Sequence, residues 1–382
     1  MTTSSRERTA TSPPRVVIAA GGTGGHIYPG LALAAAITRV ELAATVTFVG
    51  TRRGLEGDVI PRAGYALDFV TMVPFTGANR FALPLVLGRG GLQARRMLRS
   101  RRADVAVGMG GYASAPLLLG ARLSGLPSLI HESGAIPGKA NLLAARLTHN
   151  IATAFPAAVG AFPPGRDVRV TGMPLAPEFT GFDRAALRDS ARQALGLPAD
   201  AVVLFVMGGS QGATRLTATA VELGVRWRDR GDLHILLKLG ARAAADIEAE
   251  LRRVGADAVV HPVAYLDRMD SAYAAADVAL CRAGAGTVAE LAATGLPAIL
   301  VPYPFATGDH QRVNADELVA AGGAQVVADA QADAATIGPL IEALAADPAR
   351  LARMAAAAQS VGRPDAADQL ARWVMELAGK QT

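Results

Sequence analysis

The sequence predicts an α/β protein with two similar halves, each built on a parallel sheet covered by helices on both faces. Short apolar runs rich in β-branched residues alternate with helical patterns along almost the whole chain, which is typical of parallel sheets. Two of these runs end in glycine-rich loops that lead into a helical pattern, at 15–30 (RVVIAAGGTGGHIYPG) and at 201–214 (AVVLFVMGGSQGAT). Because the loops lie about half a chain apart, we expect one in each half.

The expected strands follow one another in chain order, each separated from the next by a helical or turn-forming segment. In the first half they cover residues 16–20, 45–50, 105–108, 128–131, 151–155 and 168–171. In the second half they cover residues 202–207, 234–239, 259–262, 278–281, 298–302 and 325–327. Ligands of such sheets bind at the carboxyl ends of the strands, and both glycine-rich loops lie at that edge.

The chain divides into a short tail, two domains and a last helix. Residues 1–14 are polar, contain two adjacent prolines and lack the apolar core of a signal peptide, so we expect a disordered tail. Pro174 and Pro177 disfavour a helix and indicate a linker. We therefore expect an N-terminal domain over 15–172 and a C-terminal domain over 173–365. The amphipathic stretch within 366–382 is a helix that could pack back on the first domain.

Composition and charge narrow the classes of partner. The 382 residues carry a formal net charge of +5, which favours anionic partners. No RNA-binding signature and no Cys/His cluster with zinc-finger spacing occur, so no nucleic-acid partner is expected. The single cysteine, Cys281, excludes an internal disulfide and fits a reducing cytoplasm. The uncharged stretch 105–121 contains four glycines and a proline and does not indicate a membrane span.

The glycine-rich loops predict phosphate binding without a metal or another cofactor. Backbone N–H groups and the helix dipole at a helix N-terminus favour phosphate, and glycine permits close approach. The third glycine of a dinucleotide fingerprint is replaced by Ile27, and a Walker A loop is absent. No Asp-x-Asp pair occurs, so backbone amides are expected to stabilise a leaving diphosphate.

Seven motifs in the same order resemble the MurG family, from about residue 15 to 375. They are GGTGGHIYPG at 21–30, GMGGY at 108–112, HE at 131–132, GGSQGA at 208–213, YLDRM at 265–269, CRAGAGTVAE at 281–290 and DHQRVNA at 309–315. The resemblance implies a GT-B fold, with two Rossmann-like domains around a cleft. It implies transfer of N-acetylglucosamine (GlcNAc) from UDP-GlcNAc to lipid I, giving lipid II for peptidoglycan, by a peripheral enzyme on the cytoplasmic face of the bacterial plasma membrane.

The resemblance also implies roles for individual residues. His26 would be the general base or orient the acceptor hydroxyl, since a helix N-terminus lowers an imidazole pKa; the alternative is a histidine that only caps the loop. Glu132 is the second catalytic candidate. The lipid-linked acceptor and the adjoining part of the donor would be bound by Thr23, Gly24, Gly25, Tyr112, His131 and Asn141. UDP-GlcNAc would be bound by Ser210, Gly212, Leu266, Ala285, Gly286, Thr287, Val288, Ala289, Glu290, Gln311 and Asn314.

Several of these residues have a structural alternative. Glu290 follows Thr287 by three residues, the spacing of a capping box, whereas the resemblance assigns its carboxylate to the ribose hydroxyls of UDP. Ser210 suits a helix N-cap as well as a diphosphate contact. Gln311 and Asn314 lie three apart on one helical face and are either sugar readers or part of a solvated surface.

A basic and apolar segment predicts contact with an anionic membrane. Residues 73–91 combine apolar side chains with arginines, and five further arginines follow: Arg95, Arg96, Arg99, Arg101 and Arg102. Apolar residues beside cations suit shallow docking on anionic lipid. The alternative is a loop packed on the core beside a solvated basic helix.

Three positions depart from the family pattern. Gly134 and Thr217 each stand where the family has an asparagine, and Ala176 replaces an arginine expected to contact the diphosphate. These departures leave two alternatives open. One is a related GT-B transferase or 2-epimerase with another acceptor; the other is a nucleotide-sugar-binding protein without activity.

Overall fold

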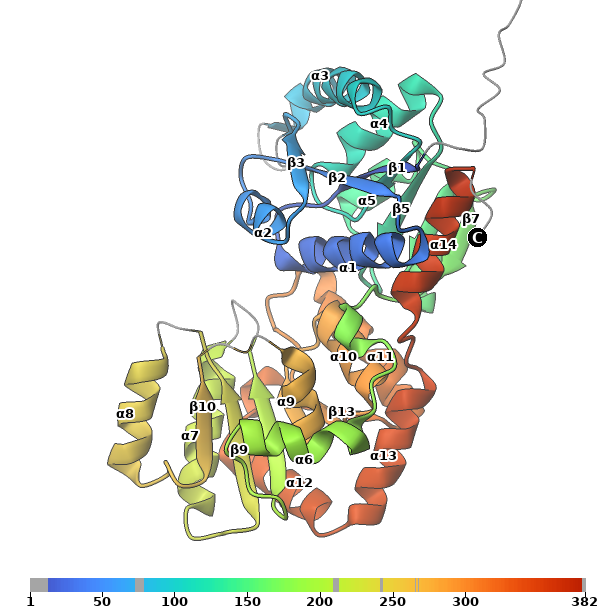
Figure 1. Cartoon of the computed structure of the whole chain (residues 1–382). Coiled ribbons are helices and arrows are strands. Elements are labelled where there is room, and N and C mark those ends of the chain that lie inside the picture. Colours follow the sequence, from blue (N-terminus) through green and yellow to red (C-terminus); the bar gives the residue numbers. More distant parts are fainter. Residues whose placement is uncertain are drawn as a thin grey trace, which may run out of the picture.

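The computed structural model describes residues 13–72, 79–208, 213–240, 243–264, 266 and 268–379. Within these residues the strands form two sheets in which every neighbouring pair is parallel. Figure 1 shows one lobe around each sheet, stacked one above the other. The predicted α/β class with two parallel sheets is therefore confirmed. Residues 1–12 of the predicted tail lie outside the described part of the chain.

The upper lobe in Figure 1, called the N lobe here, has a seven-stranded sheet in the order β3-β2-β1-β4-β5-β6-β7. Its strands are β1 (Arg15–Ala19), β2 (Thr45–Gly50), β3 (Ala66–Phe69), β4 (Val105–Gly108), β5 (Ser128–Glu132), β6 (Asn150–Thr153) and β7 (Asp167–Val170). Its helices are α1 (Gly24–Val40), α2 (Glu56–Arg62), α3 (Asn79–Ser100), α4 (Ser114–Ser124) and α5 (Lys139–Ala144), with a 3₁₀ turn at Pro156–Ala161.

The lower lobe, called the C lobe, has a six-stranded sheet in the order β10-β9-β8-β11-β12-β13. Its strands are β8 (Val202–Met207), β9 (Leu233–Lys238), β10 (Val260–Val263), β11 (Val278–Cys281), β12 (Ala298–Leu300) and β13 (Ala324–Val326). Its helices are α6 (Arg184–Ala194), α7 (Ala213–Trp227), α8 (Ala244–Val254), α9 (Met269–Ala275), α10 (Ala285–Thr294), α11 (His310–Ala321), α12 (Ala334–Ala345) and α13 (Pro348–Ser360). Shorter 3₁₀ turns cover Pro177–Phe179, Thr307–Asp309 and Asp329–Gln331.

Every predicted strand corresponds to an observed one, but two details of the prediction were wrong. Strand β3 was not expected, because its four residues ALDF include an aspartate and are at most half-buried. Strands β6 and β12 end two residues before the predicted ends at Phe155 and Pro302. Both predicted segments contain apolar residues that continue past the last paired residue, so composition alone overestimates the strand length.

The strand order places a crevice in each lobe. In the N lobe, β1 lies between β2 and β4: the chain adds β2 and β3 on one side of β1 and then β4 to β7 on the other side. In the C lobe, β8 lies between β9 and β11 in the same way. Loops at the carboxyl ends of such neighbouring strands separate and leave room for a ligand. The two glycine-rich loops follow β1 and β8, one in each crevice.

The last helix, α14 (Ala366–Leu377), returns to the N lobe and lies beside α1 (Figure 1). Its buried side chains, including Leu370, Trp373 and Val374, share an apolar cluster with the α1 face and the N-lobe sheet. At the edge of this contact Arg39 pairs with Asp368. The chain therefore crosses between the lobes twice.

Candidate active site between the lobes

The first glycine-rich loop is held by a buried carboxylate, Glu56. Its Oε2 accepts a hydrogen bond from the Gly22 backbone N–H at 3.0 Å, and its Oε1 accepts from the Thr51 backbone N–H and hydroxyl, both at 2.9 Å. Sequence analysis missed Glu56. The available signal was a pair of glycines that precede it in the chain: a Cβ on Gly54 would lie 2.0 Å from Glu56 Oε2, and one on Gly50 would lie 2.6 Å from its Cγ.

His26 lies in the first turn of α1 and faces back towards this loop. Its Nδ1 is 3.3 Å from the Gly21 carbonyl oxygen. A carbonyl can only accept, so this contact places the ring proton on Nδ1 and leaves a lone pair on Nε2. Burial lowers the pKa of His26, while the Gly21 carbonyl opposes that change. The sequence predicted the direction of this shift from the helix N-terminus, whereas burial is the main cause in the structure.

The Gly108–Tyr112 loop after β4 packs directly against the His26 ring. Gly110 and Gly111 have φ values of +102° and +76°. A Cβ on Gly110 would lie 2.5 Å from the imidazole Cδ2, so a residue with a side chain is excluded by both conformation and space. The Ser114 hydroxyl bonds both backbone polar groups of Gly110. The two loops at the carboxyl ends of β1 and β4 thus enclose the imidazole.

Next to this pocket, the end of β5 carries a network of buried polar groups. Glu132 accepts from the backbone N–H groups of Gly134 at 2.7 Å and Gly138 at 3.1 Å, and from Asn141 Nδ2 at 2.8 Å. Burial raises the pKa of Glu132, and these hydrogen bonds oppose the rise. The contacts show a carboxylate that shapes the loop after β5; a catalytic role for it stays a prediction.

His131 is fully buried behind the loop. Its Nε2 lies 2.9 Å from the Gly172 carbonyl oxygen, and burial lowers its pKa to about 4. Asn141 also donates to the His131 carbonyl, but its buried Oδ1 has no hydrogen-bond partner among the described residues. Direct contact of His131 or Asn141 with an acceptor stays a prediction, as it does for the more exposed Thr23, Gly24, Gly25 and Tyr112.

On the C-lobe side, the structure excludes a capping box between Thr287 and Glu290, the structural alternative to ribose binding. Helix α10 begins at Ala285 with Gly284 as its N-cap, so Thr287 already lies inside the first turn. The Glu290 side chain instead accepts a 2.6 Å hydrogen bond from the Tyr273 hydroxyl. Burial raises the pKa of Glu290 to about 7; Glu178 adds to the rise, while Tyr273 and Lys238 oppose it. Its environment therefore disfavours the carboxylate unless a further donor arrives.

The remaining predicted donor residues lie around the same helix. Gln311 Oε1 accepts from the Tyr303 N–H at 2.9 Å. Leu266 packs against the C-lobe core. Ala285, Gly286 and Thr287 form the half-buried first turn of α10. Ser210 and Gly212 of the second glycine-rich loop lie outside the described residues, as does Tyr265.

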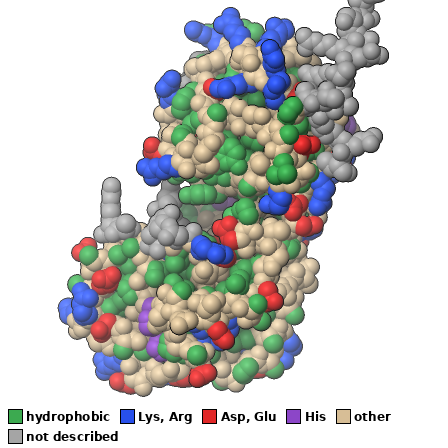
Figure 2. Space-filling view, viewed as in Figure 1, with side chains coloured by type: hydrophobic (Ala, Val, Ile, Leu, Met, Phe, Trp, Pro, Cys, Tyr) green, Lys and Arg blue, Asp and Glu red, His purple; other side chains and the backbone are tan. Residues whose placement is uncertain are grey.

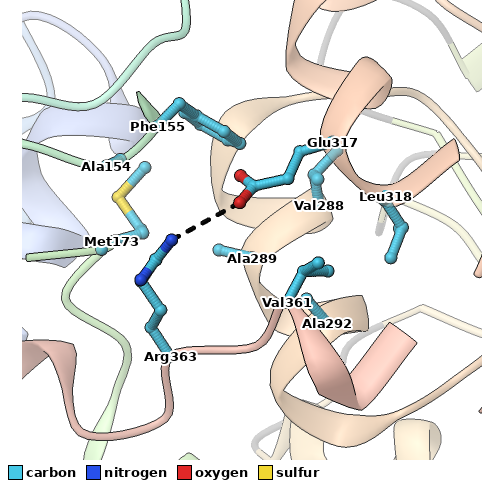
Figure 3. A pocket seen from close by; sticks show the side chains of 11 residues that line it. Ala154, Phe155, Met173, Val288, Ala289, Ala292, Glu317, Leu318, Val361 and Arg363 are labelled. Carbon is cyan, nitrogen blue, oxygen red and sulfur yellow. Dashed lines mark hydrogen bonds and ion pairs between the residues drawn. The ribbon is translucent and has the colours of Figure 1, made fainter. Parts of the chain in front are cut away.

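Val288 and Ala289 line a small cavity of about 30 Å³ between the lobes (Figure 3). Phe155 and Met173 enter from the N-lobe side, and Glu317 faces Arg363 across the opening at 3.4 Å. The cavity lies where the chain passes between lobes. Val288 is buried there, so both residues pack α10 against the neighbouring elements. Contact of Val288 or Ala289 with a nucleotide stays a prediction.

Neither a metal cluster nor a membrane span is found in the described part of the chain. No three or more His, Cys, Asp or Glu side chains among these residues are grouped to hold a metal ion. None of the described helices combines the length and apolar content needed to cross a bilayer. Figure 2 shows cationic side chains gathered over the top of the N lobe, where α3 lies in Figure 1.

Comparison with known proteins gives consistent matches along the chain. The model of the glycosyltransferase family 28 N-terminal domain matches residues 16–153, and that of the C-terminal domain matches 203–370. A relative from Nocardioides sp., named UDP-N-acetylglucosamine–N-acetylmuramyl-(pentapeptide) pyrophosphoryl-undecaprenol N-acetylglucosamine transferase, is 41% identical over 367 residues, which are 95% of this chain and 98% of the relative. A relative of the same name from Clavibacter sepedonicus is 42% identical, covering 96% and 97%.

Solved structures agree with these matches. The crystal structure of Acinetobacter baumannii MurG aligns with a TM-score of 0.76 at 26% identity, covering 95% of this chain and 100% of that one. A putative UDP-N-acetylglucosamine 2-epimerase from Listeria monocytogenes aligns with a TM-score of 0.68 at 12% identity, covering 97% and 98%. The second likeness concerns the fold alone.

Proposed function

The chain belongs to glycosyltransferase family 28, within the MurG group, and we infer that it transfers GlcNAc from UDP-GlcNAc to lipid I. The acceptor is undecaprenyl-pyrophosphoryl-N-acetylmuramyl-pentapeptide, and the product is lipid II for peptidoglycan synthesis. One observation carries this conclusion: relatives with this named activity are 41–42% identical over 95–96% of the chain. The two facing crevices provide one binding region for each substrate.

The transfer is a direct displacement that inverts the anomeric carbon. A hydroxyl oxygen of the acceptor sugar forms a β-1,4 bond to that carbon, while the bond from the carbon to the UDP oxygen breaks. His26 receives the hydroxyl proton on Nε2, since the Gly21 carbonyl holds the ring proton on Nδ1. Burial keeps the imidazole neutral and able to accept this proton. Enclosure by the glycine loops fixes the ring for that task.

Backbone amides and helix dipoles stabilise the negative charge that develops on the leaving UDP. Helix α7 begins directly after the second glycine-rich loop, so its N-terminus is placed for the diphosphate. The amides of that loop and the Ser210 hydroxyl are the proposed contacts. Glu290 accepts the ribose hydroxyls, and Gln311 contacts the sugar through its amide. These donor roles rest on the family resemblance together with the position of α10 and α11 at the C-lobe crevice.

A membrane contact follows from the chemistry of the polyprenyl acceptor. On α3, Leu85 and Leu92 are exposed by 67% and 50%. Arg89, Arg96 and Arg99 are exposed on the same helix. Exposed leucines among arginines suit shallow docking on anionic lipid at about 1 kcal/mol per arginine. We therefore place the protein peripherally on the cytoplasmic face of the plasma membrane.

One product analysis tests this function. The purified chain is incubated with UDP-GlcNAc and a soluble lipid I analogue, with and without EDTA, and the products are identified by mass spectrometry. We expect the acceptor to gain one GlcNAc in both conditions, because the sequence lacks an Asp-x-Asp metal device. Free N-acetylmannosamine formed without acceptor would instead identify a 2-epimerase. UDP binding without any product would identify an inactive binding protein.

A further inference from the structure

Asn314 joins the two lobes through its side-chain amide. It lies on α11 of the C lobe and is 1% exposed. Its Oδ1 accepts a 2.9 Å hydrogen bond from the backbone N–H of Ala135, in the N-lobe loop after β5. Its Nδ2 donates to the carbonyl of Ala283, two residues before α10, at 3.2 Å. One side chain thus connects the loop of one lobe to the start of the helix that carries Glu290.

The N-lobe loop that contains Ala135 is held in place by packing and by hydrogen bonds. Ala135 is 3% exposed and packs within the apolar core of the C lobe. At its base, the loop is held by Glu132, which binds the backbone N–H groups of Gly134 and Gly138. A displacement of Ala135 would therefore be transmitted to Glu132.

We propose that Asn314 is a positioning residue that latches the lobes in the arrangement needed for transfer. This inference rests on the proposed function. A buried side-chain amide that bonds both lobes resists their separation, because opening would break the hydrogen bond between the Ala135 N–H and Asn314 Oδ1. The second Nδ2 hydrogen is not used by either contact, so the same side chain can also meet the donor sugar. A side chain that binds both the Ala135 loop and the donor sugar would hold the acceptor loop next to an occupied donor site.

The latch differs from a simple sugar contact in what breaks it. Asn314→Ala removes the amide altogether. Ala135→Leu keeps Asn314 but adds bulk where Ala135 is enclosed, which pushes the loop off the C-lobe core. Asp316→Ala is the matched control, because Asp316 is exposed on the same helix and its only ion pair is with exposed Arg312 at 3.8 Å among the described residues.

Two measurements test this role of Asn314: the distance between the lobes, which needs no catalysis, and the rate of transfer. Spin labels at Leu42→Cys and Asp229→Cys report the separation of the lobes, since Leu42 is 86% exposed and the Asp229 side chain 92%. The native Cys281 is buried and stays unlabelled. Initial rates with UDP-GlcNAc and a lipid I analogue give kcat and both KM values.

We expect Asn314→Ala and Ala135→Leu to broaden the label distances and to lower kcat/KM for the acceptor about tenfold, with Asp316→Ala like the parent. Ala135→Leu should raise the KM for UDP-GlcNAc less than Asn314→Ala does, because it breaks the contact between the lobes but keeps the Asn314 amide on the donor side. Unchanged distances in both variants, or an unchanged acceptor kcat/KM in both, would overturn the latch. A sugar contact alone would raise only the UDP-GlcNAc KM of Asn314→Ala. A parent chain that makes no lipid II refutes the proposed function, and the distance measurement then still tests the latch.

Discussion

Glu290→Gln tests whether the carboxylate beside Tyr273 binds the ribose of the donor. The Tyr273 hydroxyl donates a hydrogen bond to Glu290 Oε2 at 2.6 Å. Burial nevertheless raises the pKa of Glu290 from 4.5 to about 7. The carboxyl group is therefore partly protonated near neutral pH before a nucleotide binds.

The raised pKa predicts how stability changes with pH. A carboxyl whose pKa is higher in the fold than in the unfolded chain stabilises the fold fully below about pH 4.5, and that stabilisation is lost as the pH rises through about 7. A pKa raised from 4.5 to about 7 corresponds to at most about 3.4 kcal/mol. Glu290→Gln cannot titrate, so its unfolding free energy should lack this decline between about pH 4.5 and 7. Urea unfolding at several pH values measures the difference.

Ribose binding should reverse the shift. Two hydroxyl donors favour the charged carboxylate and lower its pKa, so binding releases up to one proton near pH 6. Calorimetry of uridine in two buffers of different ionisation enthalpy counts that proton. Uridine is preferred to UDP because the phosphate itself titrates near pH 6. We expect proton release with the parent chain and none with Glu290→Gln, which should also bind uridine more weakly.

Tyr273→Phe is the matched variant for this experiment. Removal of the hydroxyl takes away a charge-assisted hydrogen bond of about 1.5–3 kcal/mol, which corresponds to an upward pKa shift of roughly one to two units. Uridine binding to that variant should release its proton at correspondingly higher pH. Equal proton release from the parent and Glu290→Gln would refute the ribose assignment, as would no release from the parent.

Three further changes test other parts of the site. His26→Ala should lower turnover by about 10²–10⁴-fold with little change in melting temperature, and near-normal initial rates would remove His26 from the mechanism. Glu56→Gln should cost about 2–4 kcal/mol at pH 7, because an amide N–H replaces an acceptor of the Gly22 and Thr51 bonds. These bonds lower the pKa of Glu56 although burial alone raises it, so the difference in urea unfolding should shrink below pH 4.5. Arg96→Glu with Arg99→Glu should weaken sedimentation with anionic vesicles more than tenfold, and unchanged binding would contradict membrane docking.

Most of the fold follows from local sequence patterns. Buried parallel strands such as β8 read as continuous apolar runs, and the predicted span 202–207 is the observed one. Strand β3 has a mixed sequence because it lies at the edge of its sheet, where fewer neighbours require apolar residues. The exact ends of β6 and β12 depend on hydrogen bonds to neighbouring strands, which a single segment does not encode. The domain limits drawn from the prolines stay a prediction.

The site was predictable where the backbone itself makes it and less so where distant side chains do. The glycine loop and His26 are contiguous in the sequence, and the structure places them together. Glu56 acts on that loop from 34 residues away, a contact that depends on the order of β1 and β2. Asn314 was identified as a candidate sugar reader, but its bond to Ala135 spans 179 residues and two lobes. Such contacts follow from topology and cannot be read from spacing.

These long-range contacts connect the two substrate regions physically. Ala283 precedes α10, Asn314 binds both Ala283 and Ala135, and the Ala135 loop is held by Glu132. Thermodynamic linkage requires that, if the lobes are coupled through these bonds, donor binding and acceptor binding strengthen each other equally. UDP should therefore slow hydrogen exchange at the Ala135 amide, because its bond to Asn314 opens less often. Exchange mass spectrometry of the peptide that contains Ala135, with and without UDP, measures this effect. Equal exchange in both states, under conditions where UDP saturates the chain, would show that the lobes bind their substrates independently.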